Sequence, residues 1–489
     1  MISKHFNKSS TWTWEQAKHL LNRAGFGGKP SELASFQELG RQESVAQLFD
    51  FKPSPLARPD WLAEYDNFSL RRERLRSEEE RRKRRRLNGQ RLREFQIDWL
   101  KRMSESSTPA EMFWNKMTFC WHGHFATGIQ KVKMPPPLFK QLDLLHQNAI
   151  GNFRELLHGI SRDPAMLRYL DNLQNRKGKP NENFARELME LFTLGTGNYT
   201  EKDVKEAARA FTGWSSDPFN FKIRKRQHDY GMKTFLGHTG RFDGEDVVNI
   251  ILDQPACAVF ITKKLLDFFS FNNLSEEEIQ SFADNFRDND YELKPLLEKI
   301  FLHEKFYSQN VIGSQIKSPV QLVVGTARTL GIKIENPEFF LYILNMMGQV
   351  PYQPPNVKGR PGGRTWINTS RLLTRFTFAE IISQGKIPSE IDPRSDDDFQ
   401  QNKQDKTFRR MMRRRNLSIE FDPELLIDED GADEVIDQLA AFLLSKEMTA
   451  DEHSAILKNF KYKIANGTRM KALKSAIGEI MKLPQYQLS

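Results

Sequence analysis

Helix start and stop signals recur along most of this chain, and they constrain its fold more than any other feature of the sequence. Thr13 with Gln16 and Ser275 with Glu278 have the spacing of capping boxes, in which two side chains bond each other's backbone N–H groups. Apolar residues with helical period follow both boxes, and glycines such as Gly195 end further helical segments. The sequence therefore predicts a mainly α-helical protein.

Strand signals are confined to one stretch of the chain. Residues 219–223 alternate between apolar and polar side chains, and residues 227–235 are expected to pair with them as a hairpin. Three glycines, Gly237, Gly240 and Gly244, then mark a loop before the next helix. We expect a small β-hairpin inset in an otherwise helical fold.

The 489 residues divide into four parts by composition. Residues 1–11 are predicted to be an N-terminal tail, and residues 12–385 to form one large multi-helix core. Residues 386–433 are polar, with runs of Asp and Arg, which is typical of a linker or an insertion. Residues 434–489 have the pattern of a C-terminal helical extension. No apolar run reaches the ~18 residues that a membrane span needs.

The positive charge of the chain is concentrated in one segment. Of the formal net charge of +9, residues 71–94 supply +7, from twelve Arg and Lys against five acidic residues. Glu residues stand three or four positions before Arg and Lys, which predicts a solvated helix with i,i+4 ion pairs, inserted into the core. Because aromatic residues for base stacking are not interleaved, nucleic acid is not favoured as a partner. Contact with an acidic partner stays open.

None of the common catalytic signatures is present in the sequence. It lacks the phosphate-binding G-x-x-x-x-G-K-[ST] motif, a G-x-G-x-x-G motif after a strand, H-E-x-x-H, G-x-S-x-G and the kinase motifs. Cys120 and Cys257 each lie in an apolar helical pattern, so they are predicted to be buried free thiols. Candidate functional residues must therefore be sought in four clusters of polar residues, whose patterns are less specific than these motifs.

The first cluster is His122-Gly123-His124, at the end of a helix that is expected to begin at Pro109. Histidines two positions apart diverge on a continuous helix, but they can converge if the helix ends at Gly123. With a carboxylate such as that of Glu190, they would then suit a divalent metal: zinc, iron or manganese. In the alternative interpretation, each imidazole packs against Trp and bonds a backbone carbonyl at the helix end.

The second cluster places carboxylates on one predicted helix, residues 181–194. Glu187 and Glu190 are three positions apart, a spacing by which helical metal sites are often built. Glu187 is the candidate for acid–base catalysis, and Glu190 is the candidate metal ligand. Alternatively, Glu182 complements the helix dipole and Arg186 pairs with Glu190.

The third cluster follows the predicted strands and comprises His228, Asp229 and Lys233, with His238 and Asp243 further along. His228 is a candidate general base oriented by a carboxylate, Asp229 is a second candidate catalytic residue, and Lys233 is a candidate anion ligand. A hairpin with satisfied and solvated side chains would explain the same residues.

The fourth cluster is a glycine-rich loop, residues 356–370. Its Lys358, Arg364 and Asn368 are candidate ligands for an anionic substrate, because free backbone N–H groups and a following helix N-terminus favour anions. A rigid structural loop that packs Trp366 is the alternative.

Six stretches between residues 12 and 385 are similar, in order, to one protein family: AKHLLNRAGFG (17–27), FWNKMTFCWHGHFAT (113–127), the long stretch from GNFRELL to RAFTGW (151–214), HDYGMKTFLG and its continuation (228–265), IKSPVQLVVGT (316–326) and PPNVKGRPGGRTWINTS (354–370). The chain resembles the bacterial family of domain of unknown function 1800 (DUF 1800). The family has no established activity, so the resemblance implies a relative without implying a reaction.

The resemblance also implies a partner and a location. Many relatives look exported, and they are often encoded beside proteins of a second family, domain of unknown function 1501 (DUF 1501), which resembles sulfatases. A DUF 1501-type protein is therefore an expected partner. This chain departs from the family pattern in its start, where no export signal is recognisable, so a cytoplasmic location is the default expectation and export is the implied alternative. It also departs at Arg360, where the family phrase is expected to carry Trp.

Two classes of function are consistent with these clusters. In the first, the His122/His124 turn, the Glu187 helix and the His228 loop converge on one pocket for metal-assisted or acid–base chemistry, such as hydrolysis, on an anionic substrate. In the second, the same groups form a buried polar network in a non-catalytic scaffold that binds a partner protein or a polysaccharide. Convergence of the three segments around an open cleft would favour the enzyme.

Overall fold

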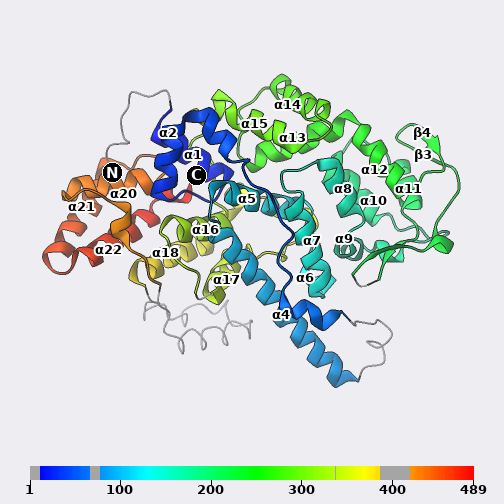
Figure 1. Cartoon of the computed structure of the whole chain (residues 1–489), viewed down its shortest axis with the longest axis horizontal. Coiled ribbons are helices and arrows are strands. Elements are labelled where there is room, and N and C mark those ends of the chain that lie inside the picture. Colours follow the sequence, from blue (N-terminus) through cyan, green and yellow to red (C-terminus); the bar gives the residue numbers. More distant parts are fainter. Residues whose placement is uncertain (1–11, 67–76, 218, 336, 386–418) are drawn as a thin grey trace.

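Helices begin where the capping signals stand. Thr13 caps α1 (Trp14–Ala24) and Ser275 caps α14 (Glu276–Asp288), and the reciprocal bond of the capping box is formed in both. The computed structural model describes residues 12–66, 77–217, 219–335, 337–385 and 419–489. Within these residues the fold is mainly α-helical, as predicted, with two small antiparallel sheets (Figure 1).

The first half of the chain is a succession of helices joined by short loops. Up to residue 104 these are α1, α2 (Pro30–Gln47), the 3₁₀-helix η2 (Asp60–Tyr65) and α4 (Glu78–Ser104). They are followed by α5 (Pro109–His124), α6 (Ile129–Val132), α7 (Pro135–Gln147), α8 (Phe153–Ser161), α9 (Pro164–Tyr169), η3 (Asn172–Gln174), α10 (Asn183–Glu187), the π-helix η4 (Leu188–Thr193) and α11 (Glu201–Ala210).

The second half continues the helical pattern after the strands. Its elements are α12 (Gly244–Asp253), α13 (Pro255–Phe268), α14, α15 (Leu293–Leu302), η6 (Glu304–Tyr307), α16 (Pro319–Thr329), α17 (Pro337–Met346), η7 (Gly363–Trp366) and α18 (Thr369–Gln384). The C-terminal elements are η10 (Pro423–Leu426), α20 (Ala432–Leu443), α21 (Ala450–Ala465), α22 (Arg469–Lys482) and η11 (Pro484–Gln487). Of the described residues, no helix combines the length and apolar character needed to cross a membrane.

The strands form two separate two-stranded sheets: β1 (Trp214–Ser216) with β2 (Phe221–Ile223), and β3 (Lys233–Phe235) with β4 (His238–Gly240), and the 3₁₀-helix η5 (Lys225–Gln227) lies between them. The predicted pairing of residues 219–223 with residues 227–235 is therefore wrong, although a small β inset is present. Leu236 and Gly237 have φ values of 46° and 83°, which is the backbone of a tight hairpin turn. This turn lets β3 pair with the residues that directly follow it.

The charged segment forms the solvated end of the 27-residue helix α4. The first half of α4 projects from the body of the molecule (Figure 1), and Arg82 makes an i,i+4 ion pair with Glu78 at 2.7 Å. In the second half, Phe95, Trp99 and Met103 are buried. The helix is thus anchored by its apolar end, and residues 71–76 of the predicted segment lie outside the described residues.

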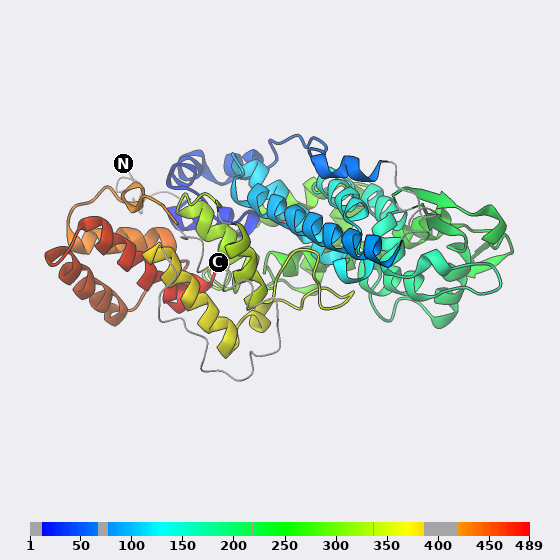
Figure 2. The same cartoon turned by 90° about the horizontal axis from the view of Figure 1, so that it is seen from below.

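The C-terminal helices share the apolar core of the rest of the chain, which runs without a break from Trp12 to Tyr486. Helix α22 packs along α18, and Figure 2 shows the two side by side. The Nζ atom of Lys18 in α1 donates to the backbone carbonyls of Ala441 and Leu444. Most of the predicted linker, residues 386–418, lies outside the described residues.

Candidate functional site

A pocket of about 670 Å³ lies where the C-terminal end of α5 meets the loop between α17 and α18. The end of α13 and the segment before α16 complete its wall. His122, His124, Lys358 and Arg364, four of the residues singled out in the sequence, line it. The first and fourth sequence clusters therefore come together in space.

A second hollow, of about 820 Å³, lies between η2 and α4 and is larger. Its central cation, Arg91, already pairs with Glu64 and with Glu94, at N···O distances of 2.5 and 2.7 Å. Acidic side chains outnumber basic ones in its lining, with Asp60, Glu64, Glu94, Asp98, Glu105 and Glu111 against Arg58, Arg91, Lys101 and Arg102, so this hollow suits an anion less than the α5 pocket does. The α5 pocket is the candidate functional site.

Positive charge dominates the wall of the α5 pocket. Three exposed cationic side chains, Lys264, Lys358 and Arg364, line it, and within the described residues none of them forms a salt bridge. Asp267 is the carboxylate among the lining residues, and burial raises its pKa. The pocket therefore has cationic groups that are free to bind an anion.

The pocket loop is held against α5 by a glycine and an arginine. Gly359 has a φ of +74°, and a Cβ at this position would lie 2.7 Å from the carbonyl oxygen of Gly123. Arg360 donates from Nε to the carbonyl of Gly348 at 2.8 Å, and it also bonds the carbonyl of Gln353. Arg360 thus fastens the loop, at the position where the family phrase was expected to carry Trp.

The two histidines of the first cluster do not converge. Helix α5 continues through Gly123 to His124, so the condition under which the two imidazoles would converge, a helix end at Gly123, is not met. The ring of His122 lies between Trp99 and Tyr352, with centroid distances of 4.8 and 4.4 Å, and its Nε2 accepts a hydrogen bond from the Tyr352 N–H at 3.3 Å. Burial, and secondarily the charge of Arg360, lowers the pKa of His122 to about 3. His122 is a neutral core residue that forms part of the pocket wall.

His124 points to the opposite side of the helix and bonds a backbone carbonyl. Its Nε2 lies 3.0 Å from the carbonyl oxygen of Phe192, and because that oxygen can only accept, Nε2 carries the proton. Burial lowers the pKa of His124 to about 4, against the opposing effect of the Phe192 bond. The unprotonated Nδ1 is therefore a lone-pair acceptor. Among the described residues, no group of three or more His, Cys, Asp or Glu side chains is placed to hold a metal ion.

The carboxylates of the second cluster lie at the junction of α10 with the π-helix η4. Glu190 accepts a hydrogen bond from the Tyr199 hydroxyl at 3.1 Å. Burial raises the pKa of Glu187, the charge of Glu190 adds to the rise, and Lys358 of the pocket loop opposes it. Neither Glu is among the residues that line the pocket, whereas Leu191 of the same segment is.

Arg186 does not pair with Glu190, as one interpretation of the sequence expected. Its guanidinium bonds Glu201 at 2.7 Å and Glu182 at 3.2 Å. These ion pairs tie α10 to α11, and they leave Glu187 and Glu190 without an arginine partner in the described structure.

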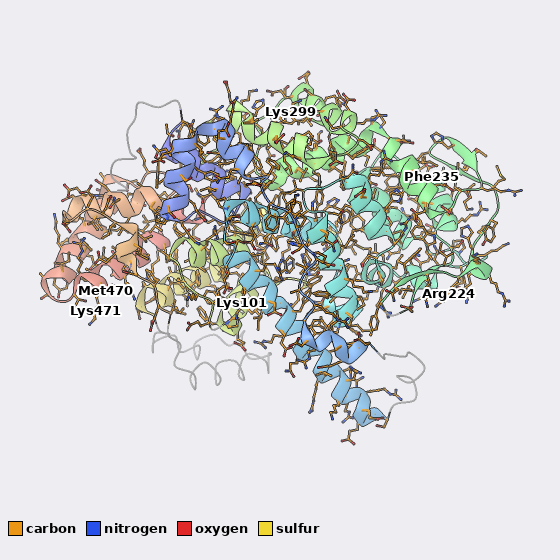
Figure 3. The ribbon with its side chains drawn as sticks, viewed as in Figure 1. Lys101, Arg224, Phe235, Lys299, Met470 and Lys471 are labelled. Atoms are coloured by element: carbon orange, nitrogen blue, oxygen red, sulfur yellow. The ribbon has the colours of Figure 1, made fainter. Side chains whose placement is uncertain are left out.

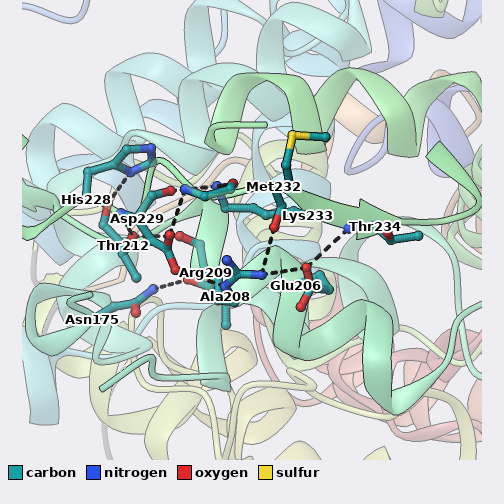
Figure 4. Close-up of polar contacts among 11 residues, drawn as sticks. Asn175, Glu206, Ala208, Arg209, Thr212, His228, Asp229, Met232, Lys233 and Thr234 are labelled. Atoms are coloured by element: carbon teal, nitrogen blue, oxygen red, sulfur yellow. Dashed lines mark hydrogen bonds and ion pairs between the residues drawn. The ribbon is translucent and has the colours of Figure 1, made fainter. Parts of the chain in front are cut away.

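The third cluster is a closed network beside α11 (Figure 4), and His228, Asp229 and Lys233 are not among the residues that line the pocket. His228 Nδ1 donates to the backbone carbonyl of Thr212 at 2.8 Å, so a carbonyl and not a carboxylate orients this side of the ring. Asp229 instead accepts from Arg209 Nε at 2.9 Å, and this partner lowers the pKa of its carboxyl. Lys233 Nζ donates to the carbonyl of Asp229 at 2.6 Å and to that of Gly231 at 3.1 Å. The expected convergence of all three segments on one pocket is therefore wrong for this cluster.

Asn368 of the fourth cluster has a structural position. Its side-chain oxygen accepts from the backbone N–H of Arg371 at 2.8 Å and caps α18. Trp366 is buried, as the structural interpretation of the loop expected. Lys358 and Arg364 remain as the loop's cationic contribution to the pocket.

Sequence reasoning missed the lysines of the pocket wall. Lys264 lies on the exposed face of α13, where nothing in the sequence separates it from other surface lysines. Lys116 is different, because it stands among Phe, Trp and Met residues in α5 and is buried. A lysine in an apolar helical run is the signal that could have found it, since lysines are almost never fully buried without a specific partner.

Comparison with known proteins gives a family and no activity. A family model described as "Protein of unknown function (DUF1800)" matches residues 19–488, nearly the whole chain. No curated protein and no solved structure matches it.

Proposed function

Because the chain belongs to this DUF1800 family, which brings no established chemistry with it, we propose from the pocket alone that the protein binds a small acidic ligand at the end of α5. The ligand class is a compound that carries a carboxylate, phosphate or sulfate group. The family match covers the C-terminal helices as well as the residues of the pocket, so we assign this binding function to the chain as a whole and not to a separate pocket domain.

One observation carries this proposal: three exposed cations without ion-pair partners in the described structure surround a pocket of about 670 Å³. Lys264, Lys358 and Arg364 come from two separate parts of the chain, so one helix or loop does not explain their proximity. Arg can bind a carboxylate or phosphate with two parallel hydrogen bonds, and lysines add point charges. The volume lies in the range of small-molecule sites.

The enzymatic extension of this proposal is hydrolysis of the acidic ligand. Glu187 is the candidate acid–base group that the site supports best, because its raised pKa and its electrostatic contact with Lys358 connect it to the pocket. His124, with Nδ1 free to accept, would receive a hydrogen bond from the ligand. Three of the roles predicted from the sequence stay predictions that the geometry does not support. These are catalysis by His228 and Asp229, anion binding by Lys233, and metal binding by His122, His124 and Glu190.

The alternative is a scaffold that holds a partner protein, such as one of the DUF 1501 type, or a polysaccharide. It is favoured by the third cluster, where His228, Asp229 and Lys233 bond within the protein and so act as structural groups. In this case the acidic ligand of the pocket would be a carboxylate or sulfate group on the partner.

Calorimetric titration with sulfate, phosphate, oxalate and citrate tests the proposal. We expect at least one anion to bind to the native protein, and the Lys358→Met/Arg364→Met double variant to bind it at least about tenfold more weakly, the equivalent of about 1.4 kcal/mol. The matched control is Lys471→Met/Arg224→Met, which removes the same charges at exposed positions elsewhere on the molecule (Figure 3). Equal weakening in both double variants would show a general charge effect and refute the site.

A metal is tested separately by elemental analysis of the purified protein beside His122→Ala/His124→Ala. Near-stoichiometric zinc, iron or manganese in the native protein, lost in a folded variant, would restore the metal hypothesis for these residues.

A further inference from the structure

Lys116 occupies an unusual position for an amine. It lies on α5 and lines the candidate pocket, yet only 3% of its surface is exposed. Its Nζ donates to the carbonyl oxygen of Gly25 at 2.9 Å, and it lies 4.9 Å from the ring centroid of Phe26 and 5.6 Å from that of Phe268. Both phenylalanines also line the pocket.

The surroundings of Lys116 favour its neutral form. An ammonium has three N–H donors, but the structure supplies one carbonyl acceptor and two aromatic faces. Burial, together with the nearby guanidinium of Arg23 and against an opposing effect of Cys120, lowers the pKa of Lys116 to about 7. Desolvation beside a second cation is a known way in which proteins activate a lysine as a nucleophile.

We propose that Lys116 is a nucleophile that forms an imine with a carbonyl compound bound in the α5 pocket. The inference rests on the proposed anion site and narrows its ligand to an aldehyde or 2-oxo acid that also carries a carboxylate or phosphate. The cations at the pocket wall hold the acidic group, and the carbonyl carbon reaches Nζ between the two phenylalanine rings.

The step is balanced without an oxidant or a reductant. The lone pair of the neutral amine attacks the carbonyl carbon, a C–N bond forms, and the carbonyl oxygen becomes a hydroxyl in the carbinolamine. That hydroxyl then leaves as water while nitrogen loses its remaining proton, which gives the C=N bond. Asp267, the carboxylate of the pocket wall, has a pKa that burial raises, and it is the group that could supply the proton to the departing hydroxyl.

A structural role for Lys116 makes a different prediction. Gly25 is the C-cap residue of α1, and a cation that bonds its carbonyl would stabilise that helix end. If capping were the whole role, Arg at this position would preserve it, and no covalent chemistry would follow.

The test is reductive trapping with glyoxylate, the smallest 2-oxo acid, and cyanoborohydride at about pH 7.5. We expect one carboxymethyl group per chain, located at Lys116 by peptide mapping, and formed at least about tenfold faster than at the exposed Lys471. Sulfate should slow the reaction at Lys116. Lys358→Met/Arg364→Met should slow it with glyoxylate but not with acetaldehyde, which carries no charge.

Two outcomes would overturn the inference. Labelling of Lys116 no faster than that of Lys471 would refute it, and so would an undiminished rate at Lys116 in the presence of saturating sulfate. Binding of sulfate, phosphate, oxalate and citrate is measured by calorimetry on the same sample: binding of at least one of them without trapping removes the imine and leaves the anion site standing, whereas binding of none removes both. Lys116→Arg, checked by circular dichroism for a native fold, should bind oxalate and yield no adduct at position 116.

Discussion

Replacing Lys116 by Met should change the pH dependence of stability in a direction that the structure fixes. The amine has a pKa of about 7 in the folded protein and its ordinary value of 10.5 in the unfolded chain. Between these values the unfolded chain holds a proton that the folded protein lacks. The lysine therefore penalises folding most below about pH 7, and the penalty disappears as the pH rises towards 10.5.

The magnitude follows from the size of this shift. One pKa unit corresponds to about 1.4 kcal/mol, so the largest penalty is of the order of 5 kcal/mol. Met has a similar length and no charge, and its introduction removes the penalty while it also removes the bond to Gly25. The difference in unfolding free energy, variant minus native, should therefore fall by about 2 kcal/mol between about pH 7.5 and pH 9.

Urea denaturation at several pH values, followed by circular dichroism, measures this difference. Taking the difference cancels the contributions of other buried cations, such as Lys18 and Lys317, that are common to both proteins. A difference that stays constant over this pH range would refute the reasoning, because it would mean that Lys116 is charged in the folded protein. A difference that grows with pH would refute it as well.

Three further predictions concern stability and reactivity. Glu32→Gln should lower the unfolding free energy by about 3 kcal/mol in urea denaturation, because it leaves the guanidinium of Arg328, 0% exposed and 2.6 Å from Glu32, without its counter-ion; a loss below about 1 kcal/mol would contradict this. Gly359→Ala should cost about 1–3 kcal/mol and weaken anion binding, whereas Gly363→Ala, also at positive φ but with open space around it, should cost less in the same assays; equal costs would rule out the contact with Gly123. Both thiols should resist Ellman's reagent in the native protein, because they are buried and burial raises their pKa values; rapid reaction of either thiol before unfolding would show that the pocket opens further than described.

The fold was predictable as far as local chemistry determines it. The capping boxes at Thr13 and Ser275 mark helix starts because the side chains that satisfy the first N–H groups lie within the same few residues. The partner of a strand is less predictable from the sequence, because residues 219–223 could pair with the edge of any nearby strand. The choice of β1 over the 227–235 segment depends on the Leu236–Gly237 turn, which engages β3 with β4.

The candidate site was half predictable for the same reason. Lys358 and Arg364 stand out in a glycine-rich loop, and both line the pocket. The helix does not end at Gly123, as convergence of the two histidines would have required, because glycine costs a helix only about 1 kcal/mol and the buried neighbours of α5 outweigh that cost. Lys116 acquires its properties from Gly25, Arg23 and Phe268, and distances between such remote residues are not encoded in a local pattern.

The contacts of Arg23 have a consequence for how the protein is made. Its guanidinium bonds the carbonyls of Phe269, Val311 and Ser489, so one residue of the first helix needs three partners that the ribosome delivers much later. At elongation rates of about 5–20 residues per second, Leu20 and Leu21 of α1, both buried in the folded protein, stay uncovered for tens of seconds. The α1 segment therefore cannot complete its native packing until Ser489 has been made.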